Sequence, residues 1–351
     1  MGIFNFKKKK VESDSKWKEL SVVNLEQISH DTSVVTLIAE NPALFNFVPG
    51  QYLTIEVEIN GETVRRSYSI CSAPSEGLKI GVKKVPNGLV SNYINNELKI
   101  GDTLKALVPE GNFTINKEKK LVVIAAGSGI TPIVSIAKSL ANDATVHLFF
   151  GNKTKNDILF SEALNQLSNV HITHYLTREE QDGWKKGRLN KANITEEIKL
   201  DLSLLKADVF LLCGPEEMIK EGIEALTMFG VSPQKIKYEL FTTPVLLIKE
   251  EIDPSLDFNG DCLLSVTLDH ETIELTMKSD KKTILDVVEN AGFDPPFSCR
   301  GGVCCSCKAK VIEGKATMRL NYSLTDEEVK NGYILTCQAK PASEKLVISY
   351  D

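Results

Sequence analysis

The sequence predicts a multi-domain protein: an antiparallel β-barrel, then a doubly wound α/β domain, then a small α+β domain. Three observations predict this order. Residues 17–116 hold short alternating strands separated by Gly, Pro and Asn, which is typical of a small barrel. Residues 117–241 alternate buried strands with helices, as in a parallel sheet covered on both faces. Residues 262–351 place a hairpin, a helix and a final strand around a cysteine-rich loop.

The composition of the 351 residues suits globular domains and argues against several classes of function. Hydrophobic residues make up 42% and charged residues 25%, so each domain can bury a core. The net charge of −6 disfavours nucleic-acid binding, and no apolar run is long enough to cross a bilayer. Residues 1–16 are basic but lack the apolar segment of a secretory signal. We expect them to be the tail of a cytoplasmic protein, whose thiols stay reduced.

Two polar stretches interrupt the strands of the predicted barrel. RRSYSICSAP begins at Arg65, and its plain interpretation is a barrel wall with an exposed arginine. PNGLVSNYI, residues 86–94, joins a glycine turn to the start of a helix, where free backbone N–H groups attract an anion. The barrel therefore contains a candidate anion site and a strand of polar side chains.

The α/β domain contains a second glycine turn between a buried strand and a helix. LVVIAA, residues 121–126, runs into GSGITP, residues 127–132, and Pro132 suits the first turn of the helix that follows. Such a turn brings bare backbone close to a phosphate, although the same pattern also occurs in tight loops without a ligand. The later strand VFLLC ends in CGP, residues 213–215, at the edge where open α/β sheets bind ligands. Cys213 is alternatively a small buried filler.

These motifs together resemble the ferredoxin–NADP reductase superfamily, in which a flavin barrel precedes a nucleotide-binding domain. The FVPGQY segment at residues 47–52 also matches the family. The resemblance implies that Arg66 pairs with the FAD pyrophosphate, that Tyr68 lies against the isoalloxazine and that Ser69 hydrogen-bonds near its N5. The other FAD contacts that it implies are Gly88 and Ser91 at the phosphates and Phe241 near the flavin. Phe241 is alternatively an ordinary core aromatic.

The resemblance also implies where the pyridine nucleotide binds. The Cys213-Gly214-Pro215 segment meets the nicotinamide, and Glu239, in YELF, lies near the reacting ring atoms. We therefore expect catalytic positions at Ser69, Cys213 and Glu239. The remaining predicted nucleotide contacts lie in turns that follow strands, at Gly127, Gly129, Thr131, Thr177, Arg178, Gly214 and Pro215.

The identity of the nucleotide depends on HYLTREEQDGWKKGRL, which ends one strand of the α/β domain. An arginine suits the 2′-phosphate of NADP, whereas an acidic residue suits the free ribose hydroxyl of NAD. Thr177 and Arg178 lie at this strand end, with Lys185 and Lys186 nearby, and favour NADPH. The acidic pair at residues 179–180 keeps NADH possible, and the segment is alternatively a solvated charge run.

Five of the eight cysteines lie in residues 299–337. Cys299, Cys304 and Cys307 give the spacing C-x4-C-x2-C, and Cys337 follows after 29 intervening residues, which is the plant-type [2Fe–2S] spacing. Two glycines at 301–302 permit positive φ and close approach of the backbone to the sulfides. A zinc site and a disulfide framework are the alternatives. We expect this loop to lie at the surface, where a partner can reach it.

The segment CRGGVCCSCKAKV, with LNYSLTDEEVKNGYILTCQAKP after it, resembles a plant-type ferredoxin domain of β-grasp fold over residues 262–351. The resemblance makes Cys299, Cys304, Cys307 and Cys337 the cluster ligands. Cys305 departs from the family, which has Gly, Ser or Ala there, and we interpret it as a small filler. Residues 242–261, which mix Pro, Gly and charged residues, are expected to be a linker.

The whole chain most resembles oxygenase reductases, including the reductase component of the phenylacetyl-CoA epoxygenase system. This implies an NAD(P)H-dependent iron–sulfur flavoprotein in which electrons pass from NAD(P)H through FAD and a [2Fe–2S] cluster. The implied acceptor is a partner oxygenase, hydroxylase or desaturase. A stand-alone flavin or quinone reductase and a redox-sensing shuttle module are the alternatives.

Overall fold

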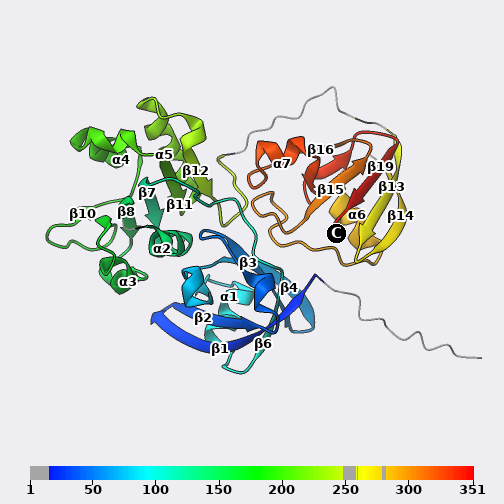
Figure 1. Ribbon diagram of the computed structural model, residues 1–351, viewed down its shortest axis with the longest axis horizontal. Helices are drawn as coiled ribbons and strands as arrows, with labels where there is room; N and C mark the ends of the chain where they lie inside the picture. Colours follow the sequence, from blue (N-terminus) through cyan, green and yellow to red (C-terminus); the bar gives the residue numbers. More distant parts are fainter. Residues whose placement is uncertain (1–15, 142, 248–257, 259, 279–281) are drawn as a thin grey trace, which may run out of the picture.

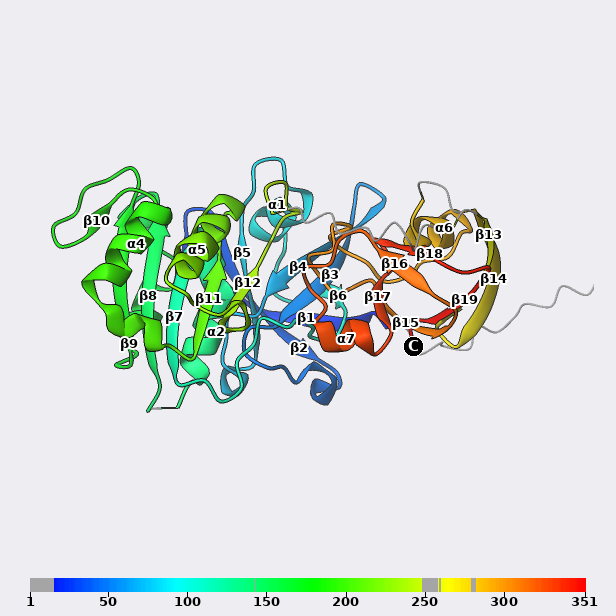
Figure 2. The same ribbon diagram turned by 90° about the horizontal axis from the view of Figure 1, so that it is seen from above.

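The computed structural model describes residues 16–141, 143–247, 258, 260–278 and 282–351. The chain forms three bodies, with the first domain between the second and the third (Figures 1 and 2). Most of the predicted tail (1–16) and of the predicted linker (242–261) lies outside the described residues. Within the described ranges, no helix is long and apolar enough to span a membrane.

The first domain is a six-stranded antiparallel sheet in the order β4-β3-β6-β1-β2-β5. A bridge between Ile70 and Ile80 joins the two outer strands, so the sheet closes into a barrel around an apolar core. Helix α1 (Leu89–Asn96) packs against β4 and β5. The strands are β1 (Lys18–Ser29), β2 (Thr32–Ala39), β3 (Tyr52–Ile59), β4 (Glu62–Ser69), β5 (Leu78–Lys83) and β6 (Thr103–Ala106).

The second domain is a parallel sheet in the order β10-β9-β8-β7-β11-β12, with a hydrophobic core on each face. Its strands are β7 (Lys120–Ala126), β8 (Thr145–Asn152), β9 (Val170–Leu176), β10 (Lys185–Lys186), β11 (Val209–Cys213) and β12 (Ile236–Glu239). Its helices are α2 (Ile130–Ser139), α3 (Ser161–Asn165), α4 (Lys191–Leu200) and α5 (Glu216–Met228). Helices α2 and α3 cover one face, and α4 and α5 cover the other.

The third domain is a five-stranded mixed sheet in the order β14-β13-β19-β15-β17, beside a two-stranded β16-β18 ribbon. The strands are β13 (Asp261–Leu268), β14 (Glu271–Lys278), β15 (Lys308–Glu313), β16 (Ala316–Met318), β17 (Tyr333–Leu335), β18 (Ala339–Pro341) and β19 (Lys345–Ser349). Helix α6 (Ile284–Asn290) begins at a capping box on Thr283 and ends before Gly292, whose φ is +87°. Helix α7 (Asp326–Lys330) is shorter.

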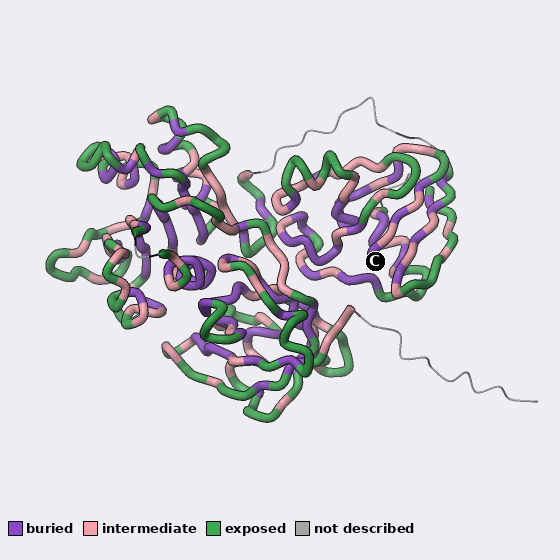
Figure 3. The backbone as a smooth tube through the Cα atoms, in the orientation of Figure 1, coloured by how far each residue is buried: buried purple, intermediate pink, exposed green. Residues whose placement is uncertain are grey.

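Short 3-10 turns join several elements, at Pro42–Phe45, Pro74–Glu76, Gly127–Gly129, Lys155–Asp157, Leu202–Lys206 and Pro233–Lys235. Buried residues concentrate inside each domain (Figure 3). The predicted fold class is confirmed, because the antiparallel, parallel and mixed sheets follow one another as expected.

Candidate functional site

Three predicted catalytic residues meet where the barrel touches the α/β sheet. Strand β4 ends at Ser69, and β11 and β12 end at Cys213 and Glu239, which are paired in register on neighbouring parallel strands. The Ser69 hydroxyl donates to Glu239 Oε2 at 3.4 Å. The fold therefore brings one hydroxyl, one carboxyl and one thiol to a single edge.

The surroundings of this group keep its acids protonated at neutral pH. Burial raises the pKa of Glu239 to about 8, and the Ser69 hydrogen bond opposes part of that rise. Glu239 is partly exposed as a residue, but its carboxyl lies at the junction of two domains, where protein atoms replace water. Burial also raises the pKa of Cys213 well above its usual value, and the charge of Glu239 adds to the effect. The site thus offers neutral polar groups rather than ions.

The position of Cys213 is compatible with both of its interpretations, a contact to the nicotinamide and a small buried filler. Its thiol is fully buried in the core beside β7, as expected of a filler. A Cβ on Gly129 would overlap the carbonyl oxygen of Cys213, so only glycine fits where the phosphate turn passes the end of β11. Gly214 follows with φ of +158°, and Pro215 caps α5. These contacts pack the two predicted nucleotide turns, at 127–132 and 213–215, against each other.

The phosphate turn itself is shaped by local hydrogen bonds. Gly127 has φ of +53°, and the Thr131 hydroxyl donates to the carbonyl of Ser128 at 2.9 Å. Thr131 is buried, and its methyl faces Gly81 of the barrel, where a Cβ would lie 2.8 Å away. The turn opens α2, whose first N–H groups lack partners within the helix, and Gly129 places this helix start against the end of β11 at Cys213.

The residues predicted to hold FAD lie on β4 and at the start of α1, which pack together. Arg66 is exposed and donates to the carbonyl of Arg65 at 2.6 Å, and Tyr68 packs partly buried on the barrel core. Gly88 caps α1, and the Ser91 hydroxyl accepts from the Val85 N–H at 3.2 Å. An exposed cation beside a helix N-terminus suits a pyrophosphate, so these residues fit the predicted group.

Phe241 follows directly after β12 and its neighbour Leu240. It is 45% exposed, which argues against the ordinary core aromatic that was its alternative. Its position beside the Ser69–Glu239 contact leaves an aromatic surface available to a planar ligand.

The predicted 2′-phosphate residues lie in a turn after β9. Thr177 and Arg178 are exposed, and their backbone N–H groups donate to the carbonyls of Asn152 and Lys153 at 3.0 and 2.9 Å. Glu179 accepts from the Lys155 N–H at 2.8 Å and is therefore tied back to the same turn. The arginine is therefore exposed in a turn that follows a strand of the parallel sheet.

Asn152 is a candidate that the sequence interpretation missed. It ends β8 and is buried, yet neither its amide oxygen nor its amide nitrogen has a partner in the described structure. A buried amide normally finds hydrogen bonds, and this one lies next to the turn of Thr177 and Arg178. The signal that could have revealed it is a polar residue closing the apolar strand TVHLFFGN.

The four predicted cluster ligands converge in the third domain. Sγ of Cys304 lies 3.1 Å from Sγ of Cys299, and the Cys337 thiol hydrogen-bonds with both Cys299 and Cys307. The Gly301 N–H donates to Cys299 Sγ at 3.4 Å. Hydrogen bonds from Cys304 and Cys337 hold the pKa of Cys299 below its usual value. Four sulfurs with backbone donors around them fit the donor set that a two-iron cluster needs.

The two glycines of this loop serve different purposes. Gly302 has φ of +75°, but Gly301 does not have positive φ, and Arg300 adopts +51° instead. Gly301 is required for space, because a Cβ there would overlap the side chain of Thr243. Cys305 is buried, and its N–H donates to the Tyr52 hydroxyl at 2.7 Å, while its thiol points to the Ser323 carbonyl. Its thiol thus stands apart from the four sulfurs.

The cluster loop is mostly enclosed, so the expectation of a surface loop was wrong for most of its length. Cys304, Cys305 and Cys307 are at most 3% exposed, whereas Cys299 is partly accessible and Arg300 is exposed. The barrel covers the loop at Cys305, and the stretch after Phe241 covers it at Gly301.

Comparisons with known proteins agree with this division of the chain. Residues 19–115 match the oxidoreductase FAD-binding domain, residues 123–222 the oxidoreductase NAD-binding domain, and residues 266–342 the 2Fe-2S iron-sulfur cluster binding domain.

Curated relatives match along almost the whole chain. The sequence is 31% identical to one of the subunits of 1,2-phenylacetyl-CoA epoxidase from Escherichia coli (strain K12), over 95% of this chain and 97% of that one. It is 32% identical to the ferredoxin reductase component of 3-ketosteroid-9-alpha-monooxygenase of Mycobacterium tuberculosis (strain CDC 1551 / Oshkosh), over 88% and 87%. The solved structure of phthalate dioxygenase reductase matches with a TM-score of 0.59 and 23% identity, over 95% of this chain and 98% of that one. At that identity it supports the fold.

Proposed function

The chain belongs to the family of oxygenase reductases that combine FAD-binding, NAD-binding and 2Fe-2S domains, and from this membership we propose a specific electron route and partner. The route starts at NADPH, passes FAD and the [2Fe–2S] cluster, and ends at a partner oxygenase of the phenylacetyl-CoA epoxidase type. The similarity to a component of that epoxidase supports this choice of partner. We place the reaction in the cytoplasm, where the eight free thiols stay reduced.

The position of strand β4 is the observation that carries the proposal. Ser69, at its end, donates to Glu239 of the α/β domain at 3.4 Å. Ser67, two residues earlier, donates to Ser298 of the ferredoxin domain at 3.1 Å. The strand that carries the predicted flavin contacts therefore touches both the predicted hydride donor site and the cluster loop.

Each group of side chains has a defined task in this route. When bound, FAD converts a two-electron donor into a source of single electrons, and the cluster provides the one-electron outlet. Arg66 and the start of α1 bind the pyrophosphate, and Tyr68 and Phe241 orient the ring system. The Ser69 hydroxyl and the protonated Glu239 carboxyl are neutral hydrogen-bonding groups at the place where the flavin and the nicotinamide would meet. Cys299, Cys304, Cys307 and Cys337 are the ligands of the cluster.

A truncated protein ending at Phe241 tests the route. It keeps the proposed flavin and nucleotide sites and loses all four ligand cysteines. It should still reduce ferricyanide, which can take electrons from flavin directly, and should largely lose reduction of cytochrome c and of the oxygenase. Steady-state assays at matched flavin content check this against the full-length protein. Full activity of the truncated form with the oxygenase would contradict the proposed exit, and saturable quinone turnover would favour a stand-alone reductase.

The preference for NADPH is tested by two neighbouring variants. Arg178→Ala should raise KM for NADPH about ten- to hundredfold and KM for NADH much less, because it removes a charge-assisted bond to the 2′-phosphate. Asn152→Leu should raise KM for both nucleotides alike, by about tenfold. The two nucleotides differ only in the 2′-phosphate, so both offer the same other groups as hydrogen-bond partners for the Asn152 amide. It should also raise Tm, since the leucine buries no unpaired polar atom.

Steady-state kinetics with each nucleotide and thermal denaturation of the nucleotide-free protein make the comparison. Equal effects of Arg178→Ala on both nucleotides would remove the preference for NADPH. Unchanged KM values in Asn152→Leu would show that its amide does not contact the nucleotide.

A further inference from the structure

The interface between the barrel and the ferredoxin domain contains a buried arginine with no assigned role. Arg65 precedes the predicted FAD ligand Arg66 on β4, but the two side chains have different surroundings. Arg66 is exposed, whereas only 2% of the Arg65 side chain is exposed. A guanidinium stays charged in proteins, so its burial requires a complete set of partners.

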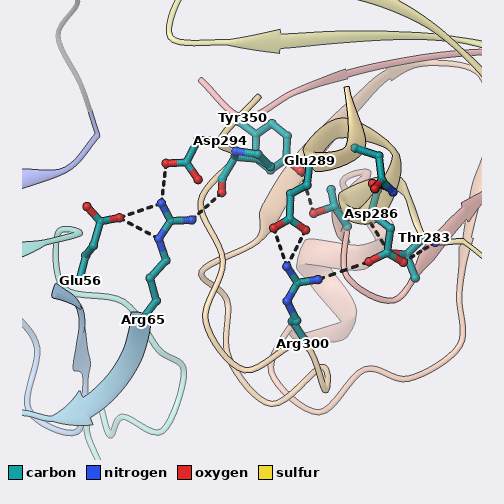
Figure 4. A network of polar contacts seen from close by, with 11 residues as sticks. Glu56, Arg65, Thr283, Asp286, Glu289, Asp294, Arg300 and Tyr350 are labelled. Atoms are coloured by element: carbon teal, nitrogen blue, oxygen red, sulfur yellow. Dashed lines mark hydrogen bonds and ion pairs between the residues drawn. The ribbon is translucent and has the colours of Figure 1, made fainter. Parts of the chain in front are cut away.

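Arg65 finds its partners on both sides of the interface (Figure 4). Its Nε donates to Glu56 Oε2 of the neighbouring strand β3 at 2.8 Å. Its Nη2 donates to Asp294 Oδ2 at 2.6 Å and its Nη1 to the Pro295 carbonyl at 3.2 Å, both in the ferredoxin domain. The planar fork of an arginine fixes the direction of each of these bonds.

Aromatic rings extend this contact toward the cluster loop. The Arg65 guanidinium lies between the rings of Trp17 and Phe297, at 4.7 and 4.8 Å from their centroids. Arg300 stands over Phe297 at 4.2 Å and pairs with Asp286 and Glu289 of α6. Figure 4 shows Arg65 with Glu56 and Asp294, and Arg300 with Glu289 and Asp286. Arg300 directly follows Cys299 in the chain. The contacts from Arg65 through Phe297 to Arg300 therefore end beside a predicted cluster ligand.

Neutral hydrogen bonds also cross the interface. The hydroxyls of Thr54 and Ser306 lie 2.7 Å apart, Ser67 donates to Ser298, and the Cys305 N–H donates to Tyr52. Hydroxyl groups rotate to suit their partners, so these bonds tolerate small shifts of one domain against the other. The Arg65 fork differs from these bonds, because it is charged and its geometry is fixed.

We propose that Arg65 is a positioning residue that fixes the cluster loop against the flavin strand and thereby sets the rate of electron transfer from the barrel to the cluster. This rests on the proposed electron route. The rate of electron transfer falls steeply with the distance between donor and acceptor. A small displacement of the loop therefore slows electron transfer from the flavin to the cluster and leaves the earlier hydride transfer unchanged.

Anaerobic stopped-flow reduction of the holoprotein by NADPH separates the two steps. Flavin bleaching reports hydride transfer, and the later loss of iron–sulfur absorbance reports cluster reduction. Arg65→Met should slow cluster reduction about tenfold with flavin bleaching unchanged, since misplacement of this kind affects only the step that crosses the interface. Arg65→Lys should recover part of the rate. Cytochrome c reduction should fall in parallel, while ferricyanide reduction stays at the wild-type rate.

Two further variants keep the test decisive. Asp294→Asn removes only the ferredoxin-side charge, whose side chain is 71% exposed, and should slow the same step by a smaller factor. Lys191→Met, which breaks an exposed pair with Glu224 inside the α/β domain, should change neither step. Wild-type cluster reduction in Arg65→Met with full cofactor content, or equal slowing of both steps, would overturn the proposal. If wild-type protein failed to reduce its cluster with NADPH, the electron route itself would be wrong.

Discussion

Glu239 is the residue whose chemistry depends most on the assembly of the domains. Its ordinary pKa of 4.5 rises to about 8 because its carboxyl lies where the barrel meets the end of β12. Between these two values the folded protein holds a proton that the unfolded chain has already released. Glu239 therefore favours folding most at low pH, and this contribution is lost as the pH rises toward 8.

Replacing this carboxyl should change the pH dependence of stability in a defined direction. The Tm of the wild type minus that of Glu239→Gln should fall from pH 5 to about 8 and then level off, because the amide cannot ionise. Glu118→Gln is the matched control: hydrogen bonds lower the Glu118 pKa below 4.5, so its Tm difference should stay constant from pH 5 to 9. If the Tm of the wild type and that of Glu239→Gln changed in parallel with pH, the raised pKa of Glu239 would be contradicted.

Single residues were predictable from the sequence where the local pattern decides their role. The spacing from Cys299 to Cys307 and the proline at 132 are local signals, and both lie where the motifs place them. Arg65 carried no such signal, and the local signal for Asn152 was a polar residue at the end of an apolar strand. The partner Asp294 lies 229 positions away from Arg65, and the unpaired amide of Asn152 appears only after β8 packs into the sheet.

The cluster loop is the element that joins ligand chemistry to domain packing. Its sulfurs face one another, while its backbone N–H at Cys305 bonds outward to Tyr52. Cys305 thus holds the loop mainly through its backbone N–H bond to Tyr52, and a side-chain substitution does not remove this bond. Cys337 comes from the turn between β17 and β18 and closes the sulfur set from the other side.

Cys305→Ser should therefore keep the cluster, and Cys337→Ser should lose most of it. Serine keeps the Cys305 N–H bond and costs about 1 kcal/mol or more for a new buried hydroxyl. Iron and acid-labile sulfide, measured after anaerobic purification, should stay near two each per chain in Cys305→Ser and wild type. Similar losses in both variants would show that the ligand set includes Cys305, and zinc without sulfide would show that the site is not an iron–sulfur centre.

Elements followed the sequence patterns closely where periodicity and turn chemistry agree. The hairpin of β13 and β14 and the helix α6 before Gly292 formed as expected, because each is specified by residues close in sequence. The loop between Cys299 and Cys307 differed, since its burial depends on Tyr52 and Thr243 from other domains. Spacing predicts a ligand set, but it contains no information about which distant surface will cover it.

In the whole molecule, the barrel contacts the two other domains through two separate interfaces. On the side of the α/β domain, the Ser135 hydroxyl of α2 donates to the Ser72 carbonyl at 2.7 Å, and Lys138 pairs with Glu76 at 2.9 Å. The other side carries the Arg65 contacts with the ferredoxin domain. Each interface should therefore control its own step of the electron route.

Ser135→Ala should slow flavin reduction by NADPH and leave cluster reduction unchanged, which is the reverse of the pattern expected for Arg65. The substitution leaves the buried Ser72 carbonyl without this donor, at a cost of about 1–3 kcal/mol, and loosens α2 against the barrel. Ser139→Ala is the control, because Ser139 bonds only within α2, to the Ser135 carbonyl. Stopped-flow traces of flavin and cluster reduction compare the two variants. An equal effect of Ser135→Ala and Ser139→Ala would argue against control of flavin reduction by this interface.

The enclosure of the cluster loop also bears on survival in air. A protein that serves an oxygenase works where dissolved oxygen is plentiful, and iron-bound sulfur is open to oxidative attack wherever it meets solvent. Cys304 and Cys307 are almost fully buried, and Cys337 is nearly as well covered. Cys299 alone among the four is partly accessible, so oxidative damage should begin at that corner. The packing that brings donor and acceptor together thus also acts as a barrier that prolongs the working life of the enzyme.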